Sequence, residues 1–204
     1  MPAKEIARDR ILSDDELARV IIAARKIGGP YGGIVELLAL TGQRREEVAR
    51  SSWEEMDFES LTWTLSGART KNGKPHIVHL SDPAIAVLNG VRKETKYIFS
   101  TTGEAPFQAF SAAKHELDEA SGVTGWRLHD LRRTCVSGMA RLGVPPHVAD
   151  KILNHQAGTI SGVAAVYQRH NFLAERRNAL NSWGNHVAQI VRQAAGRADI
   201  RMVA

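Results

Sequence analysis

The stretch LHDLRRTC, residues 128–135, places one histidine and two arginines within two turns of an expected helix. Leu128 and Leu131 supply apolar positions at the spacing of one helix face. One interpretation is an ordinary amphipathic helix, with Leu131 inward and both arginines in water. The other is that this concentration of positive charge meets an anionic ligand. Either interpretation agrees with the stretch alone, so the rest of the sequence must distinguish between them.

The size and composition of the chain indicate a globular protein. Its 204 residues, 43% of them hydrophobic, are enough for one domain with its own core. No run of about 18 apolar residues occurs, as a membrane-spanning helix would require. The first residues, MPAKEIARDR, lack the apolar segment of a secretory signal. We therefore expect a cytoplasmic protein with no membrane partner.

The charge balance favours a polyanionic partner. The net charge is +5 and the isoelectric point is about 9.6. The excess lies in residues 103–204, which contain 12 Lys and Arg against 8 Asp and Glu. Nucleic acid fits this imbalance, although many basic proteins bind none. The single Cys135 excludes an intrachain disulfide, and we expect a buried structural thiol there.

Helix signals dominate the first fifty residues. Ser13 precedes three acidic residues and a helical apolar pattern, which predicts a helix over residues 13–26. The sequence GGPYGG should break it, and IVELLALTG predicts a buried helix that stops at Gly42. A short helix over residues 45–50 is expected next.

The β signal is concentrated in residues 61–80. These residues are rich in β-branched and aromatic side chains and contain Asn72-Gly73, which predicts a hairpin with a tight turn. A short strand is expected at residues 97–99. Further helices are expected at residues 82–89, 107–121, 128–142, 145–153, 162–169 and 172–183. The predicted fold class is therefore mainly α with a small antiparallel β-sheet (α+β).

Two common kinds of catalytic site are absent from the sequence pattern. The segment GARTKNGK, residues 67–74, is not a phosphate-binding loop, because five residues instead of four separate its glycines. Pro75 also stands where that motif needs Ser or Thr. The histidines form no H-E-x-x-H motif, and no acidic cluster has two-metal spacing. Metal catalysis is therefore not indicated.

Two cationic positions remain as candidates. Arg44, in TGQRREEV, is followed three residues later by Glu47, which can hold its guanidinium in place. A plain surface ion pair is the alternative. Lys71 lies beside the expected Asn-Gly turn, where its side chain can extend from the hairpin. Hairpin tips often carry lysines without a function, so this position is informative only in combination with others.

The motifs TGQRREEV, RTKNGK, LHDLRRT, ILNHQAGT and VYQRH, in this order, resemble the catalytic domain of the tyrosine recombinases, the phage integrase family. The resemblance covers about residues 10–183. It implies the tyrosine recombinase catalytic-domain fold. One departure is Asn154, where the family often has glycine before the histidine. Asparagine tolerates the left-handed conformation, so we expect the turn to be kept.

The resemblance assigns a role to six residues. Its catalytic set falls on Arg44, Lys71, His129, Arg132, His155 and Tyr167, with Glu47 in support. It implies a DNA strand-breaking and rejoining transesterase that forms a 3′-phosphotyrosine on Tyr167 and needs no metal, ATP or other cofactor. His129 is the candidate base, and Lys71 would protonate the departing 5′-oxygen.

Physical chemistry supports these roles independently. Transfer at a phosphodiester requires neutralised charge on the phosphate, a nucleophile and a proton for the leaving group. Two arginines can supply that neutralisation, because each planar guanidinium can donate two hydrogen bonds to one phosphate. Tyrosine, with an ordinary pKa near 10, needs nearby cations or a base to become a nucleophile. On this interpretation LHDLRRTC is positive because Arg132 and His129 face a scissile phosphate.

The sequence also predicts a domain organisation. Residues 1–10 form a lead-in, residues 11–183 the catalytic domain and residues 184–204 a C-terminal helical tail. The tail has an apolar stripe formed by Val187, Ile190, Val191, Ala194, Ala195 and Ala198. Gly184 is the expected hinge, so the stripe packs on its own domain or passes to a neighbouring copy.

The resemblance also implies partners. These are double-stranded DNA, further copies of the chain in a tetrameric synaptic complex, and accessory DNA-bending or directionality proteins. Full-length relatives usually carry an N-terminal DNA-clamping domain, so we expect a fragment of a bacterial or phage protein.

Two alternative functions stay open. A type IB topoisomerase would relax supercoils by the same tyrosine chemistry without pairing two sites. A catalytically idle DNA-binding domain could keep the fold alone. TGQRREE and LNHQAGT are more similar to integrases, and the presence of all six expected residues argues against an idle domain.

Overall fold

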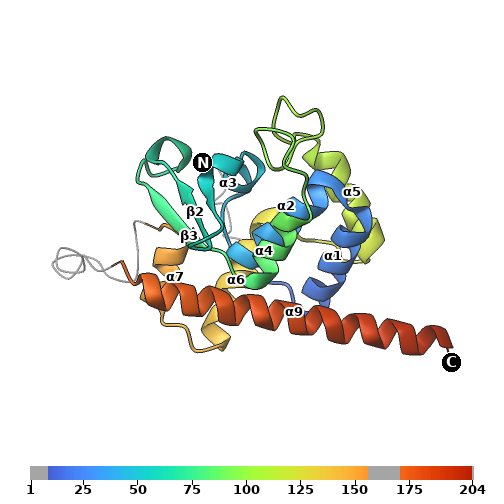
Figure 1. Ribbon diagram of the computed structural model, residues 1–204. Coiled ribbons are helices and arrows are strands. Elements are labelled where there is room, and N and C mark those ends of the chain that lie inside the picture. The colour runs from blue at the N-terminus through green and yellow to red at the C-terminus, as the bar shows by residue number, and fades with distance from the viewer. Residues whose placement is uncertain (1–8, 156–170, 204) are drawn as a thin grey trace, which may run out of the picture.

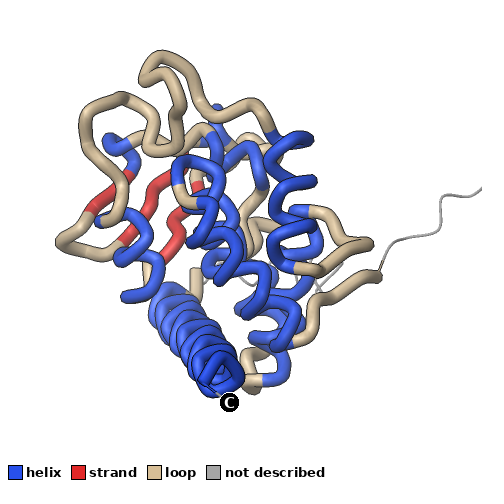
Figure 2. Tube along the Cα trace, turned by 90° about the vertical axis from the view of Figure 1, so that its right-hand side faces the viewer, coloured by secondary structure: helices blue, strands red, loops and turns tan. Residues whose placement is uncertain are grey.

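The computed structural model describes residues 9–155 and 171–203, and Figure 1 shows their arrangement. Helices form most of it, with a small sheet at one side of the helical body (Figure 2). The described α-helices are α1 (Asp14–Ile27), α2 (Gly29–Thr41), α3 (Arg45–Ala49), α4 (Asp82–Asn89), α5 (Phe110–Ser121), α6 (Leu128–Arg141), α7 (Pro146–Ile152) and α9 (Leu173–Val203), and two short 3-10 helices cover Trp53–Glu55 and Gly67–Arg69. The expected helix over residues 162–169 lies outside the described residues.

Helix α2 is the centre of the fold, in contact with α1, α3, α4, α6 and α9. It is apolar almost throughout, so it can be buried on all sides. The predicted boundaries of its neighbour α1 are confirmed, because Ser13 and Glu16 form the expected reciprocal cap. Gly42 ends α2 in the left-handed conformation, as predicted, with φ of 65°. Helix α2 starts earlier than expected, because Gly28 alone separates it from α1.

The sheet contains three antiparallel strands in the order β1 (Met56–Asp57), β2 (Thr62–Leu65) and β3 (His76–His79). The predicted hairpin is confirmed, with Leu65 opposite His76. The prediction of a tight Asn-Gly turn is wrong, because residues 66–75 form a wider loop between β2 and β3. The Thr70 hydroxyl donates to the Lys74 carbonyl at 2.8 Å, lies 3.1 Å from the Gly67 carbonyl oxygen, and so closes this loop from within.

Two smaller details of the sheet also differ from the prediction. Residues 97–99 contribute only an isolated bridge between Tyr97 and Ser52 rather than a strand. Strand β1 was not expected, because two residues are too few to show an alternating pattern.

Helix α9 runs unbroken through Gly184, so the expected hinge is wrong. A Cβ atom at Gly184 would lie 2.4 Å from the Ser81 hydroxyl oxygen, so glycine permits close packing here rather than bending. The preceding Trp183 is fully buried, and its indole N–H donates to the Ala39 carbonyl of α2 at 2.8 Å. These contacts fix the middle of α9 to the core.

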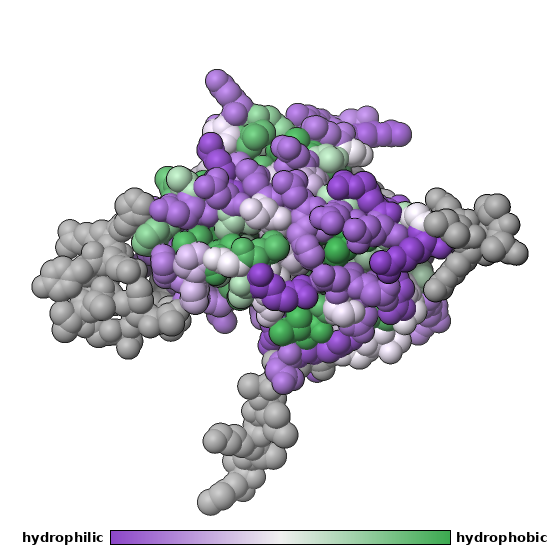
Figure 3. All heavy atoms as spheres, turned by 90° about the horizontal axis from the view of Figure 1, so that it is seen from below, coloured by the Kyte–Doolittle hydropathy of each residue, from purple (hydrophilic) through white to green (hydrophobic). Residues whose placement is uncertain are grey.

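The first part of the predicted apolar stripe, up to Ala194, packs on the chain's own core, whereas Ala195 is exposed and the Ala198 side chain lies outside the described residues. Val187 and Val191 are buried, and Ile190 and Ala194 pack against the core cluster. Beyond them α9 extends past the body of the molecule (Figure 1). Seen from the side on which α9 lies, the surface is mostly hydrophilic with separate apolar patches (Figure 3). In the described ranges no helix is long and apolar enough to cross a membrane.

Replacing Gly184 by alanine should destabilise the protein. The added methyl group would overlap Ser81, and such overpacking costs about 1–3 kcal/mol. This cost exceeds the stabilisation of about 1 kcal/mol that replacing glycine by alanine gives inside a helix. Gly196→Ala is the matched control, because no atom lies within 4 Å of its added Cβ on the same helix. Urea unfolding should show a lower stability for Gly184→Ala only, and equal stabilities would contradict the packing role of Gly184.

Candidate active site

Arg44 lies at the start of α3, where a buried carboxylate holds it. The Glu47 side chain accepts hydrogen bonds from the Arg44 backbone N–H and guanidinium, both at 2.9 Å. Glu47 is only 3% exposed, so this pair is more than the surface ion pair weighed as the alternative. The arrangement follows from the sequence, because the left-handed Gly42 ends α2 and turns the chain into α3.

The first turn of α6 carries His129 and is fixed by Asp130. The fully buried Asp130 carboxylate accepts from the Arg127 backbone N–H at 2.8 Å and from the Arg133 guanidinium at 2.6 Å. Arg133 is therefore held at the edge of the helix, and the exposed His129 lies at the helix N-terminus.

Arg132 points into the protein rather than into water, and only 4% of it is exposed. Its guanidinium donates to the carbonyl of Gly42 at 2.7 Å and to that of Leu153 at 2.6 Å. It thus connects the end of α2 to the end of α7. Burial, followed by repulsion from Arg44, lowers the pKa of Arg132 to about 10, so the group stays charged at neutral pH.

His155 follows the end of α7 and is exposed. Asn154 precedes it with φ of 52°, so the prediction that asparagine keeps the left-handed turn is confirmed. The His155 backbone N–H donates to the Asp150 carbonyl at 3.0 Å, and its Nδ1 lies 3.5 Å from the Asp150 carboxylate. The turn at Asn154 therefore places His155 next to Asp150 of the preceding helix, α7.

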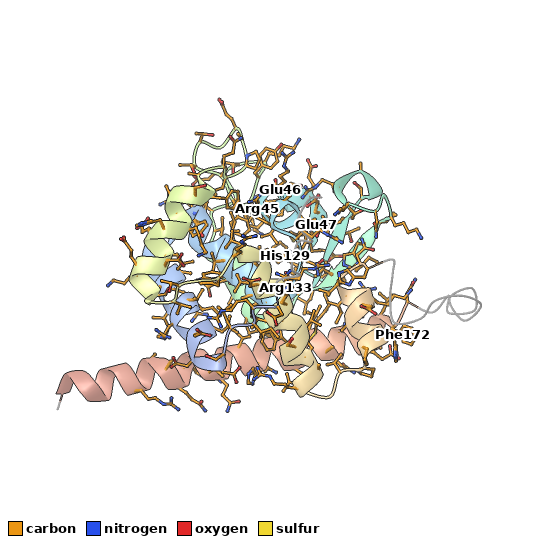
Figure 4. All side chains as sticks on the ribbon, turned by 180° about the vertical axis from the view of Figure 1, so that it is seen from behind. Arg45, Glu46, Glu47, His129, Arg133 and Phe172 are labelled. Atoms are coloured by element: carbon orange, nitrogen blue, oxygen red, sulfur yellow. The ribbon has the colours of Figure 1, made fainter. Side chains whose placement is uncertain are left out.

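A cleft of about 780 Å³ opens between the hairpin loop, α3, α5 and the start of α6. Figure 4 shows Glu46 and Glu47 of α3 and His129 of α6 at this opening. Its lining residues are Arg44, Arg45, Glu46, Glu47, Arg69, Thr70, Lys71, Phe110, Ser111, Lys114, Trp126, Arg127, Leu128 and His129. Three residues of the predicted set, Arg44, Lys71 and His129, therefore share one cleft. Arg132 and His155 do not line it, and Tyr167 lies outside the described residues.

The charges of Arg44 and Arg132 nevertheless influence the pKa values of both His129 and His155. Although His129 is exposed at its edge, partial loss of contact with water lowers its pKa, and the positive charges of Arg133, Arg132 and Arg44 lower it further. Partial loss of contact with water likewise lowers the pKa of His155, and repulsion from Arg132 and Arg44 adds to this against the opposing effect of Asp150. The same two guanidinium groups therefore contribute to the lowered pKa of both imidazoles. The lowered pKa values favour their neutral form at neutral pH, in which an imidazole can accept a proton.

Several cleft residues were missed by the sequence analysis. Arg69 donates to both carboxylate oxygens of Glu55, at 2.7 and 3.2 Å, and also to the Glu47 carbonyl at 3.1 Å. Across the cleft, the Arg45 guanidinium lies 4.9 Å from the Phe110 ring centre and the Lys114 ammonium 4.1 Å from that of Trp126. Arg69 is the first residue of the quoted motif RTKNGK, but no sequence signal indicated its role or the aromatic partners.

The chemistry that this arrangement permits is anion binding. Cationic side chains dominate the cleft, and its two acidic residues, Glu46 and Glu47, are paired with arginines of α3 or its cap. Guanidinium groups suit phosphate, because their planar donors match two phosphate oxygens. The cleft is open and lies on one side of the molecule, as an extended polyanion would require.

Comparison with known proteins identifies the family. Residues 10–173 match the phage integrase family. The chain belongs to this family. The prophage integrase IntA of Escherichia coli K12 is 28% identical over 156 residues, which cover 74% of this chain and 37% of that relative. The chain thus spans less than half the length of the curated relatives that it matches.

Solved structures of integrases share the fold. The integrase of mycobacterium phage Brujita superposes with a TM-score of 0.65 at 18% identity, covering 93% of this chain and 66% of that one. A lambda integrase dimer bound to a COC′ core site gives 0.62 at 19% identity, covering 79% and 63%. The predicted class, mainly α with a small antiparallel sheet in a tyrosine recombinase catalytic-domain fold, is therefore confirmed for this integrase-family chain.

Proposed function

We propose that this chain is the catalytic domain of a site-specific DNA recombinase, which cuts and rejoins DNA strands through Tyr167. The observation that carries the proposal is the cationic cleft that brings Arg44, Lys71 and His129 together, in a chain of the phage integrase family. Extended phosphate backbone is the polyanion that such an open cleft fits.

The proposed reaction is a transesterification. The Tyr167 oxygen attacks the scissile phosphorus, an O–P bond to tyrosine forms, and the bond from phosphorus to the 5′-oxygen breaks. The products are a 3′-phosphotyrosine and a free 5′-hydroxyl. One bond replaces another of the same kind, so rejoining by the reverse reaction requires no ATP.

Each nearby side chain has a proposed part in this step. His129 accepts the tyrosine proton, which agrees with its lowered pKa. Arg44, held by Glu47, and Arg132 stabilise the negative charge on the phosphate oxygens, with His155 beside them. Lys71, exposed in the hairpin loop, donates the proton that the 5′-oxygen needs on leaving. We propose that these cations take the role that metal ions have in other phosphoryl-transfer enzymes.

The proposed partners are double-stranded DNA and further copies of the chain, in a tetrameric complex that pairs two sites, with accessory DNA-bending or directionality proteins. The lambda integrase in the comparison is a dimer on its core-site DNA, which supports this arrangement. The segment of α9 beyond Ala194 extends past the body and is the part of the proposed 184–204 tail that can reach a neighbouring copy (Figure 1). The known relatives are phage and prophage proteins, so we propose bacterial cytoplasmic DNA as the substrate.

Covalent capture on nicked DNA tests the proposed function. With the nick placed just 3′ of the scissile bond, cleavage releases a short 5′-hydroxyl fragment that diffuses away and leaves the protein on the 3′ end. We expect a denaturation-resistant adduct in the presence of a chelator and without ATP. Absence of an adduct on any DNA would indicate an idle DNA-binding domain. Supercoil relaxation without a defined site would favour the topoisomerase alternative.

A further inference from the structure

Three consecutive carbonyl groups at the end of α7 receive hydrogen bonds from distant parts of the chain. The last carbonyls of a helix have no partner within the helix and need one elsewhere. The Leu153 carbonyl accepts from Arg132, as described above. The Ile152 carbonyl accepts from the Gln43 amide at 3.0 Å and lies 3.0 Å from Nε2 of His76. The third carbonyl, that of Asn154, accepts from Asn72 of the hairpin loop at 3.0 Å.

Asn72 and Asn154 are joined by more than this one bond. The Asn72 amide N–H also donates to the Asn154 side-chain oxygen at 2.8 Å, and the Asn154 amide donates back to the Asn72 side-chain oxygen at 3.3 Å. We call these three bonds the amide clasp. Its members lie 82 positions apart in the sequence. Asn154 can take part because its left-handed backbone, which a glycine would also adopt, carries a side chain here.

The clasp connects two proposed catalytic groups. His155 directly follows Asn154. On the other side, the Asn72 side-chain oxygen accepts from the Lys74 backbone N–H at 3.1 Å and lies 3.2 Å from the Thr70 hydroxyl oxygen. These contacts fix the loop on both sides of Lys71. The loop that carries Lys71 and the turn that carries His155 are therefore held to each other by one asparagine pair.

We propose that the amide clasp is a positioning device that holds Lys71 in register with His155 at the scissile phosphate. The inference rests on the proposed function and concerns Asn72 and Asn154, which do not themselves touch the reacting atoms. A general acid must lie within hydrogen-bond reach of the oxygen that it protonates. A loop lysine on a long, flexible side chain meets this condition only if its backbone is held, because displacement by about 1 Å can cost on the order of 10²-fold in rate.

Two substitutions remove different parts of the clasp. Asn72→Ala removes all three bonds of the clasp together with the bond from the Lys74 backbone N–H, and we expect cleavage of ordinary DNA to fall by about 10- to 100-fold. Asn154→Gly keeps the left-handed backbone and the carbonyl that accepts from Asn72, so a smaller loss is expected. The double variant should cleave no more slowly than Asn72→Ala alone, because the two side chains act through the same contact. Asn89→Ala, at an exposed position ending α4, is the control and should leave cleavage unchanged.

A sulfur leaving group distinguishes positioning of Lys71 from a general structural role. When sulfur replaces the 5′-oxygen at the scissile bond, the leaving thiolate needs no proton. The rate of Asn72→Ala on this substrate should then return to within a few-fold of the parent rate, as should that of Lys71→Ala. A loss caused by altered folding would persist on both substrates. Thermal melting of each variant is measured alongside.

The outcomes separate this inference from the function on which it rests. If the unaltered chain cleaves neither substrate, the proposed function fails. If it cleaves both and Asn72→Ala cleaves ordinary DNA at the parent rate, the clasp has no positioning role. Loss of cleavage without recovery on sulfur, in a variant that melts like the parent, would also overturn the proposal. If Asn72→Ala does not fold, cleavage of both substrates by Asn154→Gly is compared with that of the parent instead, because glycine readily adopts the required backbone.

Discussion

A chain with Tyr167→Phe should form no detectable covalent adduct with nicked DNA while binding that DNA as tightly as the parent. Phenylalanine keeps the ring but lacks the hydroxyl oxygen that would bond to phosphorus, so the step has no nucleophile. Affinity depends mainly on contacts between cationic side chains and phosphates, which this substitution leaves in place. Gel shifts measure binding, and denaturing gels measure the adduct.

The chain contains three tyrosines, so the other two must be considered as nucleophiles and one of them supplies a control variant. Tyr31 is buried at 3% exposure, and burial raises the pKa of its hydroxyl, so it can neither reach DNA nor ionise readily. Tyr97 is partly exposed but does not line the cleft, so Tyr97→Phe is the matched variant and should form the adduct normally. An adduct that persists in Tyr167→Phe and disappears in Tyr97→Phe would assign the nucleophile to Tyr97.

Local signals in the sequence predicted much of the fold. The reciprocal bonds of Ser13 and Glu16 and the left-handed Gly42 depend on residues at most a few positions apart, so the sequence pattern alone indicates them. The same holds for Arg44 and Glu47, whose pairing is a matter of helical spacing. What spacing could not indicate is that Glu47 is buried, which makes the pair a fixed part of the site.

Contacts between distant segments were not predictable from one sequence. Asn72 was interpreted only as a turn residue, yet its amide bonds to a residue 82 positions away. The wide loop around it depends on Thr70, whose hydroxyl could equally have pointed to solvent. Gly184 was interpreted as a hinge because glycine permits bending, but the same lack of a side chain permits close packing on Ser81. In each case the local pattern allowed two outcomes, and tertiary packing selected one.

Arg132→Lys should reduce cleavage by about 10²-fold or more, with a modest change in DNA binding. The guanidinium bridges two carbonyl groups, those of Gly42 and Leu153, with separate nitrogens of one rigid plane. An ammonium group offers a single centre and cannot reproduce this bridge. Burial already lowers the pKa of Arg132 to about 10, and the same burial would lower the pKa of a lysine from a lower starting value. The variant therefore loses the planar donor and part of its charge.

Arg133→Lys is the matched control for Arg132→Lys, one position along the same helix. Arg133 is partly exposed and pairs with Asp130 through one nitrogen, a contact that an ammonium can make, so cleavage should change little. Single-turnover cleavage on nicked DNA, with thermal melting of both variants, separates loss of chemistry from loss of folding. A large loss in Arg132→Lys without a matching drop in melting temperature would place its guanidinium at the phosphate. Near-normal cleavage would mean that the positive charge of LHDLRRTC serves only to join the ends of α2 and α7.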